Sequence, residues 1–124
     1  MSCLETVAVV VLQHIRGETA AFILRDDDPE FIGTEVLTCD VKLALSGFRV
    51  PPVSAPVLLS ITPVFAPATP TERAYWHLTM TALQTTALAA GGYIADARIL
   101  YPSSLVIYTL PWGIQLSQRV TVTP

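Results

Sequence analysis

His14 and His77 are the two side chains of this sequence whose ordinary pKa lets them exchange protons near neutral pH. Neither has the partners that catalysis needs. No His/Cys/Asp cluster shows metal-ligand spacing, and there is no Gly-x-Ser-x-Gly elbow or Gly-x-x-x-x-Gly-Lys loop. His77 lies between Trp76 and Leu78 in a strand-like stretch, so we interpret it as a half-exposed sheet histidine. The sequence therefore predicts a protein that is not an enzyme.

The acidic run at residues 26–30, Asp-Asp-Asp-Pro-Glu, has two interpretations. Clustered carboxylates suit a calcium ion, a hard cation that prefers oxygen ligands. Asp and Pro are also ordinary turn residues, and the Asp-x-Asp-x-Asp-Gly spacing of a calcium loop is missing. We favour the turn and expect no metal or other cofactor, although ion binding by Asp26 to Asp28 stays open. Asp96 and Arg98 are two residues apart on a predicted strand, which indicates a surface or interface ion pair.

The composition is poor in charge. Hydrophobic residues make up 52% of the 124 residues and charged ones 14%, with a mean hydropathy of +0.53, whereas soluble domains average about 25% charged residues. The longest apolar run, residues 7–12, is far shorter than the ~18 residues of a membrane-spanning helix, and no basic residue precedes it as in a secretory signal. We therefore expect no membrane span, and an apolar surface covered by copies of the chain and by other proteins.

Two further classes of interaction are disfavoured. The net charge is −3 and Lys42 is the single lysine, so the sequence offers no basic stripe for direct binding of nucleic acid. Cys3 and Cys39 are expected to be reduced thiols, with Cys39 a small side chain in the core.

The pattern of apolar residues predicts seven or eight strands and one helical turn. Residues 35–45 alternate most clearly, and Pro63 makes residues 57–65 an edge strand or a bulged one. Thr81 is placed to cap a helical turn at residues 81–90, with Gly91-Gly92 as its stop, and this turn would cross between two sheets. The strands are expected at residues 6–13, 18–25, 35–45, 57–65, 75–80, 93–99, 105–110 and 114–123.

This pattern is typical of an all-β fold, an antiparallel β-sandwich of the Ig-like or jelly-roll-like kind with seven to eight strands, in a single domain spanning residues 1–124. The strand at residues 6–13 is dense in β-branched residues and would be buried on both faces or pair with another subunit. Two proline-bearing loops, residues 46–56 and 66–73, are expected at an exposed end of the fold. The predicted interface residues are Val7, Val9, Val11, Arg49, Val50, Pro52, Pro67, Pro70 and Trp112.

Several short motifs together resemble a known family. Gly17-Glu18-Thr19 precedes the second strand, Thr85 to Leu88 leads through Gly92-Tyr93 to Asp96, and Val120-Thr121-Val122-Thr123 closes the chain. This order resembles small β-sandwich domains of tailed-phage structural proteins, such as the N-terminal domain of upper baseplate proteins and the modules at fibre bases. The sequence departs from that pattern in lacking the Asp-Gly-x-Pro hairpin and in having no fibre, coiled coil or receptor domain after Pro124.

The resemblance implies a role in assembly within a virion put together in the host cytoplasm. The chain would be a non-catalytic adaptor of the tail, neck or fibre base, a homo-oligomer that contacts portal, neck, tail, capsid or fibre proteins. Two alternatives stay open: a capsid decoration protein, and a soluble β-sandwich that binds carbohydrate or peptide.

Overall fold

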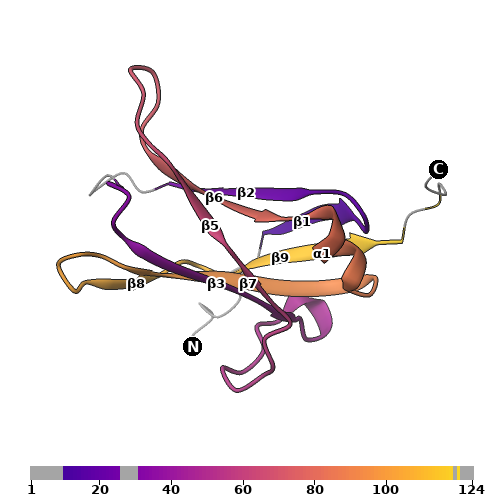
Figure 1. Ribbon diagram of the computed structural model, residues 1–124. Helices are drawn as coiled ribbons and strands as arrows, with labels where there is room; N and C mark the ends of the chain where they lie inside the picture. Colours follow the sequence, from indigo (N-terminus) through magenta and orange to yellow (C-terminus); the bar gives the residue numbers. More distant parts are fainter. Residues whose placement is uncertain (1–9, 26–30, 119, 121–124) are drawn as a thin grey trace.

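Two β-sheets face each other in the computed structural model, which describes residues 10–25, 31–118 and 120 (Figure 1). The larger sheet has the strand order β1-β9-β7-β3-β4, with β8 also paired to β7, and the smaller has the order β2-β6-β5. The elements are β1 (Val11–Ile15), β2 (Ala20–Leu24), β3 (Val36–Leu43), the 3₁₀ turn η2 (Ser46–Phe48), β4 (Leu59–Ile61), β5 (Pro63–Ala66), β6 (Tyr75–Met80), α1 (Ala82–Ala87), β7 (Gly91–Leu100), β8 (Val106–Tyr108) and β9 (Trp112–Ser117).

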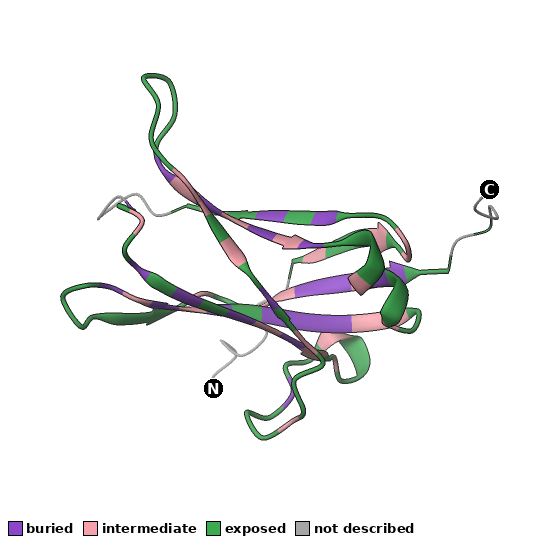
Figure 2. Ribbon diagram, viewed as in Figure 1, coloured by how far each residue is buried: buried purple, intermediate pink, exposed green. Residues whose placement is uncertain are grey.

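The core lies between the two sheets, as the alternating sequence pattern predicts (Figure 2). In β3 the side chains of Leu37, Cys39 and Val41 are buried, while their neighbours on the other face are exposed or half-buried. Strand β6 in the opposite sheet alternates in the same way. An all-β sandwich is therefore the fold of the described residues.

One strand pair departs from the expected antiparallel arrangement. Strand β1 runs parallel to β9, with Val11 opposite Gly113 and Ile15 opposite Ser117. After β1 the chain crosses to the smaller sheet, so no hairpin holds β1 against a sequence neighbour. Its partner comes instead from the far end of the chain, where nothing fixes an antiparallel direction.

The described residues form nine strands rather than eight because the predicted strand at residues 57–65 divides. Its first part, β4, pairs with β3 in the larger sheet, and its second part, β5, pairs with β6 in the smaller one. Pro63 is the first residue of β5, and both pieces are edge strands. This placement agrees with the expectation from Pro63, because proline has no N–H to donate to a central ladder.

The helix α1 crosses between the sheets at the predicted place. Thr81 caps it: its Oγ1 accepts a hydrogen bond from Gln84 N at 3.1 Å, and the Gln84 side chain accepts one from Thr81 N at 2.9 Å. The helix ends at Ala87, before the glycines that were expected to stop it. Gly92 belongs to β7, where a Cβ would lie 3.0 Å from the ring of Phe48; the Gly92 position therefore leaves room for this aromatic side chain.

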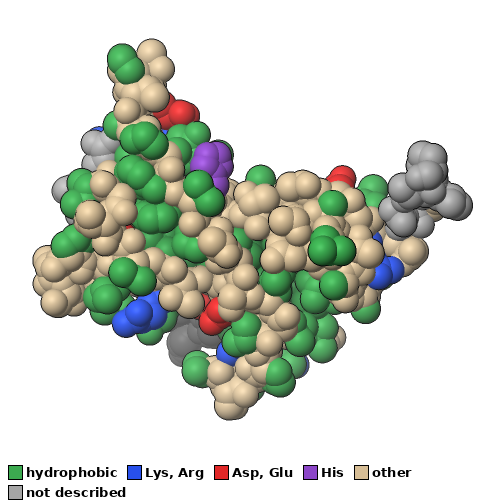
Figure 3. Space-filling view, viewed as in Figure 1, with side chains coloured by type: hydrophobic (Ala, Val, Ile, Leu, Met, Phe, Trp, Pro, Cys, Tyr) green, Lys and Arg blue, Asp and Glu red, His purple; other side chains and the backbone are tan. Residues whose placement is uncertain are grey.

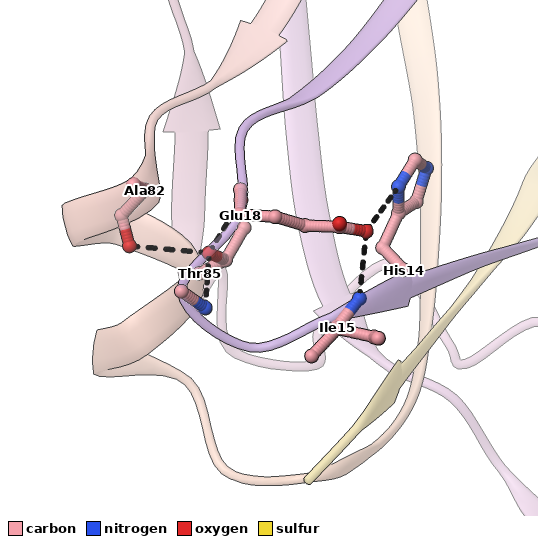
Figure 4. Close-up of polar contacts among 6 residues, drawn as sticks. His14, Ile15, Glu18, Ala82 and Thr85 are labelled. Atoms are coloured by element: carbon pink, nitrogen blue, oxygen red, sulfur yellow. Dashed lines mark hydrogen bonds and ion pairs between the residues drawn. The ribbon is translucent and has the colours of Figure 1, made fainter. Parts of the chain in front are cut away.

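The turn between β1 and β2 packs on α1 and closes one end of the sandwich (Figure 4). Thr85 is fully buried there; its Oγ1 accepts a hydrogen bond from Gly17 N at 3.0 Å and donates to Glu18 O at 2.8 Å. Arg16 donates to the carbonyls of Thr86 and Leu88, each at 2.7 Å, and so satisfies groups that the end of a helix leaves free. Among the described residues, no helix is long and apolar enough to cross a membrane.

Candidate functional site

The end of the sandwich opposite α1 contains an apolar groove. Its volume is about 450 Å³, and it lies between β1 and β9 of the larger sheet and β2 of the smaller one. Leu110 is 81% exposed at the groove, although it is a large apolar side chain, and Ile23 is 53% exposed on the outer face of the neighbouring strand β2. The groove is lined by Leu12, Ala21, Phe22, Ile23, Leu24, Leu78, Thr109, Leu110 and Trp112.

Both strands that border the apolar groove are sheet edges. In the described residues β2 pairs only with β6 and β1 only with β9, so each has one side without a neighbouring strand. Such an edge presents N–H and C=O groups that can pair with a strand from another chain. Apolar side chains and free backbone groups therefore occur at the same place, which is the arrangement of a docking surface.

Trp112 is the predicted interface residue that the structure places at this groove. It is half-buried at the start of β9, where its ring lies 5.7 Å from that of Phe22. Val11 belongs to the neighbouring strand but points to the other face of the sheet, since a Cβ on Gly113 would meet both Val11 and Phe48. Leu12 is the β1 residue at the groove, and the predicted interface residue Val11 lies on the other face of β1.

The other predicted interface residues do not join Trp112 in one surface. Arg49 and Pro52 are exposed in the loop after η2, and Val50 lies beside a second groove. Pro67 and Pro70 are exposed in the loop between β5 and β6, which projects from the body of the sandwich (Figure 1). Val7, Val9 and the acidic run at residues 26–30 lie outside the described residues.

The second groove, called the polar groove below for the charged side chains that it contains among apolar ones, lies on the outer face of the larger sheet, under the loop that follows η2. Its volume is about 470 Å³. Lys42 Nζ donates a hydrogen bond to Val53 O at 2.7 Å and so ties this loop to the sheet. The groove is lined by Thr38, Asp40, Lys42, Val50, Pro51, Val53, Ile94, Asp96, Arg98 and Tyr108.

Asp40 and Asp96 face each other in this polar groove, because they are direct partners in the register of β3 and β7. Ser60 Oγ donates to Asp40 Oδ1 at 2.8 Å. The expected Asp96–Arg98 ion pair is not formed, and no ion pair involves either aspartate within the described part of the chain. Burial raises the pKa of Asp96 above its ordinary value, Asp40 raises it further, and Lys42 lowers it.

The opposition of the two carboxylates predicts that Asp96→Asn stabilises the protein. The pKa of Asp96 is higher in the folded protein than its ordinary value of 3.8. The folded protein is therefore more stable while Asp96 is protonated, and this stability is lost as the pH rises through the raised pKa. We expect the variant to gain about 0.5 kcal/mol of unfolding free energy at pH 7, since like charges directly opposed across strands cost about this much. The gain should vanish near pH 3. Urea denaturation at the two pH values measures both quantities.

Glu72→Gln is the control for this prediction. Glu72 Oε2 accepts from Arg25 Nη2 at 2.9 Å in an exposed ion pair, so its loss should cost at most about 0.5 kcal/mol, with the opposite sign. A loss of stability in Asp96→Asn at pH 7 would contradict the proposed repulsion.

The other side chains capable of acid–base or nucleophilic chemistry are His77, His14 and Cys39, and each is held by contacts within the fold. His77 is half-buried on β6 with its ring 4.8 Å from that of Tyr75, which agrees with a sheet histidine. His14 Nδ1 lies 3.4 Å from Glu18 Oε1, and the same oxygen accepts from Ile15 N (Figure 4). Cys39 is a buried thiol, and burial, followed by Asp96 and Asp40, raises its pKa to about 12. A thiol in that state is a poor nucleophile.

Comparisons with known proteins add little to this geometry. No protein family and no curated protein matches the chain. One solved structure that is similar is the crystal structure of CopC from Methylosinus trichosporium OB3b, with 13% sequence identity and a TM-score of 0.46 over 96% of this chain and 93% of that one. The function is therefore argued from the residues of this chain.

Proposed function

We propose that this chain is a non-catalytic structural subunit of a bacteriophage virion, an adaptor of the tail, neck or fibre base that works by joining protein partners. The observation that carries the assembly role is the apolar groove between two sheet edges, where Leu110 is exposed. The resemblance of the Gly17-Glu18-Thr19 and Thr85 to Asp96 motifs supplies the phage context.

The surface supports an assembly role in a second way. Hydrophobic side chains spread over the visible face of the molecule with few charged groups between them (Figure 3). Covering apolar area of this kind with a partner would be favourable, because its removal from water contributes about 25 cal/mol per Å². A subunit enclosed by virion neighbours would hide this surface.

The proposal is tested on purified particles. The tagged chain is supplied during infection by a phage that lacks its own copy of the gene, and its number per particle is measured by mass spectrometry. We expect incorporation of the wild-type chain and of Leu83→Asp, and at least a tenfold loss with Leu110→Asp. Leu83 and Leu110 are matched, since they are 80% and 81% exposed and lie at opposite ends of the sandwich. Absence of the wild-type chain from particles would overturn the proposal.

The same measurement separates an adaptor from a capsid decoration protein. An adaptor occurs in the small number set by the symmetry of the tail, neck or fibre base. A decoration protein occurs once or more for every capsid lattice site, so its number follows the major capsid protein.

A carbohydrate- or peptide-binding module is the second candidate, and the polar groove favours it. Tyr108, which is 64% exposed, lies opposite Arg98 in the register of β7 and β8, and the aspartates complete a set of convergent polar groups. A binding site of this class combines an apolar surface with a few placed polar groups. Binding of an oligosaccharide on a glycan array, lost in Tyr108→Ala and in Asp96→Asn, would favour this function over assembly.

A further inference from the structure

We propose that the apolar groove binds residues 4–9 of a second copy of this chain. This segment, Leu-Glu-Thr-Val-Ala-Val, would add as an extra strand along the free edge of β2. The inference deepens the proposed assembly function by naming one partner. It describes how two copies join and holds whether or not they enter a particle.

The edge of β2 has the length and character that such a strand needs. Its five residues span about 17 Å, which matches a five- to six-residue partner strand. The side of β2 away from β6 has no partner strand among the described residues, so its backbone groups there can form a new ladder. Beside this edge Leu110, Ile23 and Trp112 offer apolar contacts for alternate side chains of the added strand.

The sequence of the N-terminal segment fits this role. Residues 6–12 read Thr-Val-Ala-Val-Val-Val-Leu, a run of β-branched and apolar residues that favours extended backbone. The chain passes from this segment into β1 at Val10, whose carbonyl accepts a hydrogen bond from Gly113 N at 2.7 Å. Val10, the described residue that follows the segment, therefore lies close to Trp112, which lines the groove.

A second copy fits better than the segment's own groove. Strand β2 belongs to the opposite sheet, about 10 Å away, and the chain crosses to it only after β1. To reach its own β2, the segment would have to reverse direction just before Val10. Residues 6–10 contain no Gly, Pro, Asn or Asp, the residues that tight reversals use. A segment that continued in the direction of β1 would leave its own groove and could reach the groove of another molecule.

Each copy carries both a segment and a groove, so two copies related by a two-fold axis make the contact twice and close the pair. Trp112, which lines the groove, carries an unpaired donor. Trp112 Nε1 is buried and has no hydrogen-bond partner in the part of the chain that the structure describes, although buried indoles normally find one.

The experiment uses the full chain in solution and measures its mass by light scattering at several concentrations. We expect a dimer for the wild type and for the matched control Leu83→Asp. A donor variant, Val7→Asp with Val9→Asp, places charges in the segment and should be a monomer. An acceptor variant, Leu110→Asp, places a charge at the groove and should also be a monomer. Circular dichroism establishes that all four proteins are folded.

Two mixtures distinguish a specific exchange from general loss of solubility or fold. The donor variant keeps its groove and the acceptor variant keeps its segment, so mixing the two monomers should restore a dimer with one exchanged strand. A fluorescent peptide of residues 1–10, with Ser in place of Cys3, should bind the donor variant. Adding Leu110→Asp to that variant should weaken peptide binding at least tenfold by fluorescence anisotropy, whereas adding Leu83→Asp should not.

Three results would overturn the proposal: a wild-type chain that stays monomeric at all concentrations, a donor variant that remains a dimer, or a peptide that does not bind. A monomeric wild type whose donor variant binds the peptide would place the segment in its own groove. A dimer that is not incorporated into virions would count against the proposed function alone. A monomer that enters particles would count only against the binding of the segment to the groove of a second copy.

Discussion

Ile114→Ala is expected to lower the free energy of unfolding by about 3 kcal/mol, within the range that truncating a buried aliphatic side chain costs. Ile114 is fully buried in β9, opposite Leu12 in β1 and Tyr93 in β7. Alanine would remove methyl and methylene groups from the centre of the larger sheet, where neighbouring strands on both sides limit any collapse onto the cavity. Urea denaturation followed by tryptophan fluorescence measures the loss.

Leu110→Ala is the comparison for Ile114→Ala. Leu110 precedes β9 by two residues and is 81% exposed, so its truncation should change the free energy of unfolding by no more than about 0.5 kcal/mol. We expect the opposite order for dimer formation. Among folded molecules, Leu110→Ala should weaken association more than Ile114→Ala does. Equal losses of stability would mean that Leu110 belongs to the core and would remove the main support for a docking surface.

Local patterns predicted the fold well where each residue's environment follows from its neighbours in sequence. The alternation of Leu37, Cys39 and Val41 fixed the buried face of β3, because side chains alternate strictly along a strand. The Thr81 cap likewise marked the start of α1 in the predicted crossover. Both signals act over a few residues, so no knowledge of the partner strands was needed.

The candidate sites were harder to predict because they depend on which strands become neighbours. Asp40 and Asp96 are 56 positions apart, and only the register of β3 against β7 brings them together. The choice between Val11 and Leu12 as the groove residue depends on which face of β1 meets β2, and the parallel pairing of β1 with β9 decides this. A stretch apolar on both faces, such as residues 7–12, has no alternation to indicate that choice.

Glycines were misinterpreted for a related reason. Gly91-Gly92 follows a predicted helix, where glycine commonly ends the helix. Gly92 and Gly113 instead lie in neighbouring strands under the ring of Phe48, and a Cβ at Gly113 would come 2.9 Å from it. Close approach of an aromatic ring from a loop 44 or more residues away leaves no local signal in the sequence.

Thr85→Val is expected to lower the free energy of unfolding by about 2 kcal/mol. Valine has nearly the shape of threonine, so the buried space stays filled while the hydroxyl is lost. Gly17 N would lose its acceptor at 3.0 Å and Glu18 O its donor at 2.8 Å. Both hydrogen bonds are partly buried, and a backbone group left without a partner out of reach of water costs about 1–3 kcal/mol. Thermal and urea denaturation measure the loss.

Thr86→Val is a matched control for this change, one residue further along α1. Thr86 is exposed, and its Oγ1 donates only to Ala82 O of the same helix at 2.8 Å, so water can replace that bond and the cost should stay below about 0.5 kcal/mol. Similar small losses in both variants would show that water reaches Gly17 and Glu18. A large loss confined to Thr85→Val would show that this hydroxyl, beside the hydrogen bonds of Arg16, helps join α1 to the turn between β1 and β2. Since those two strands also border the apolar groove, the hydroxyl at the closed end would then help set their separation at the open end.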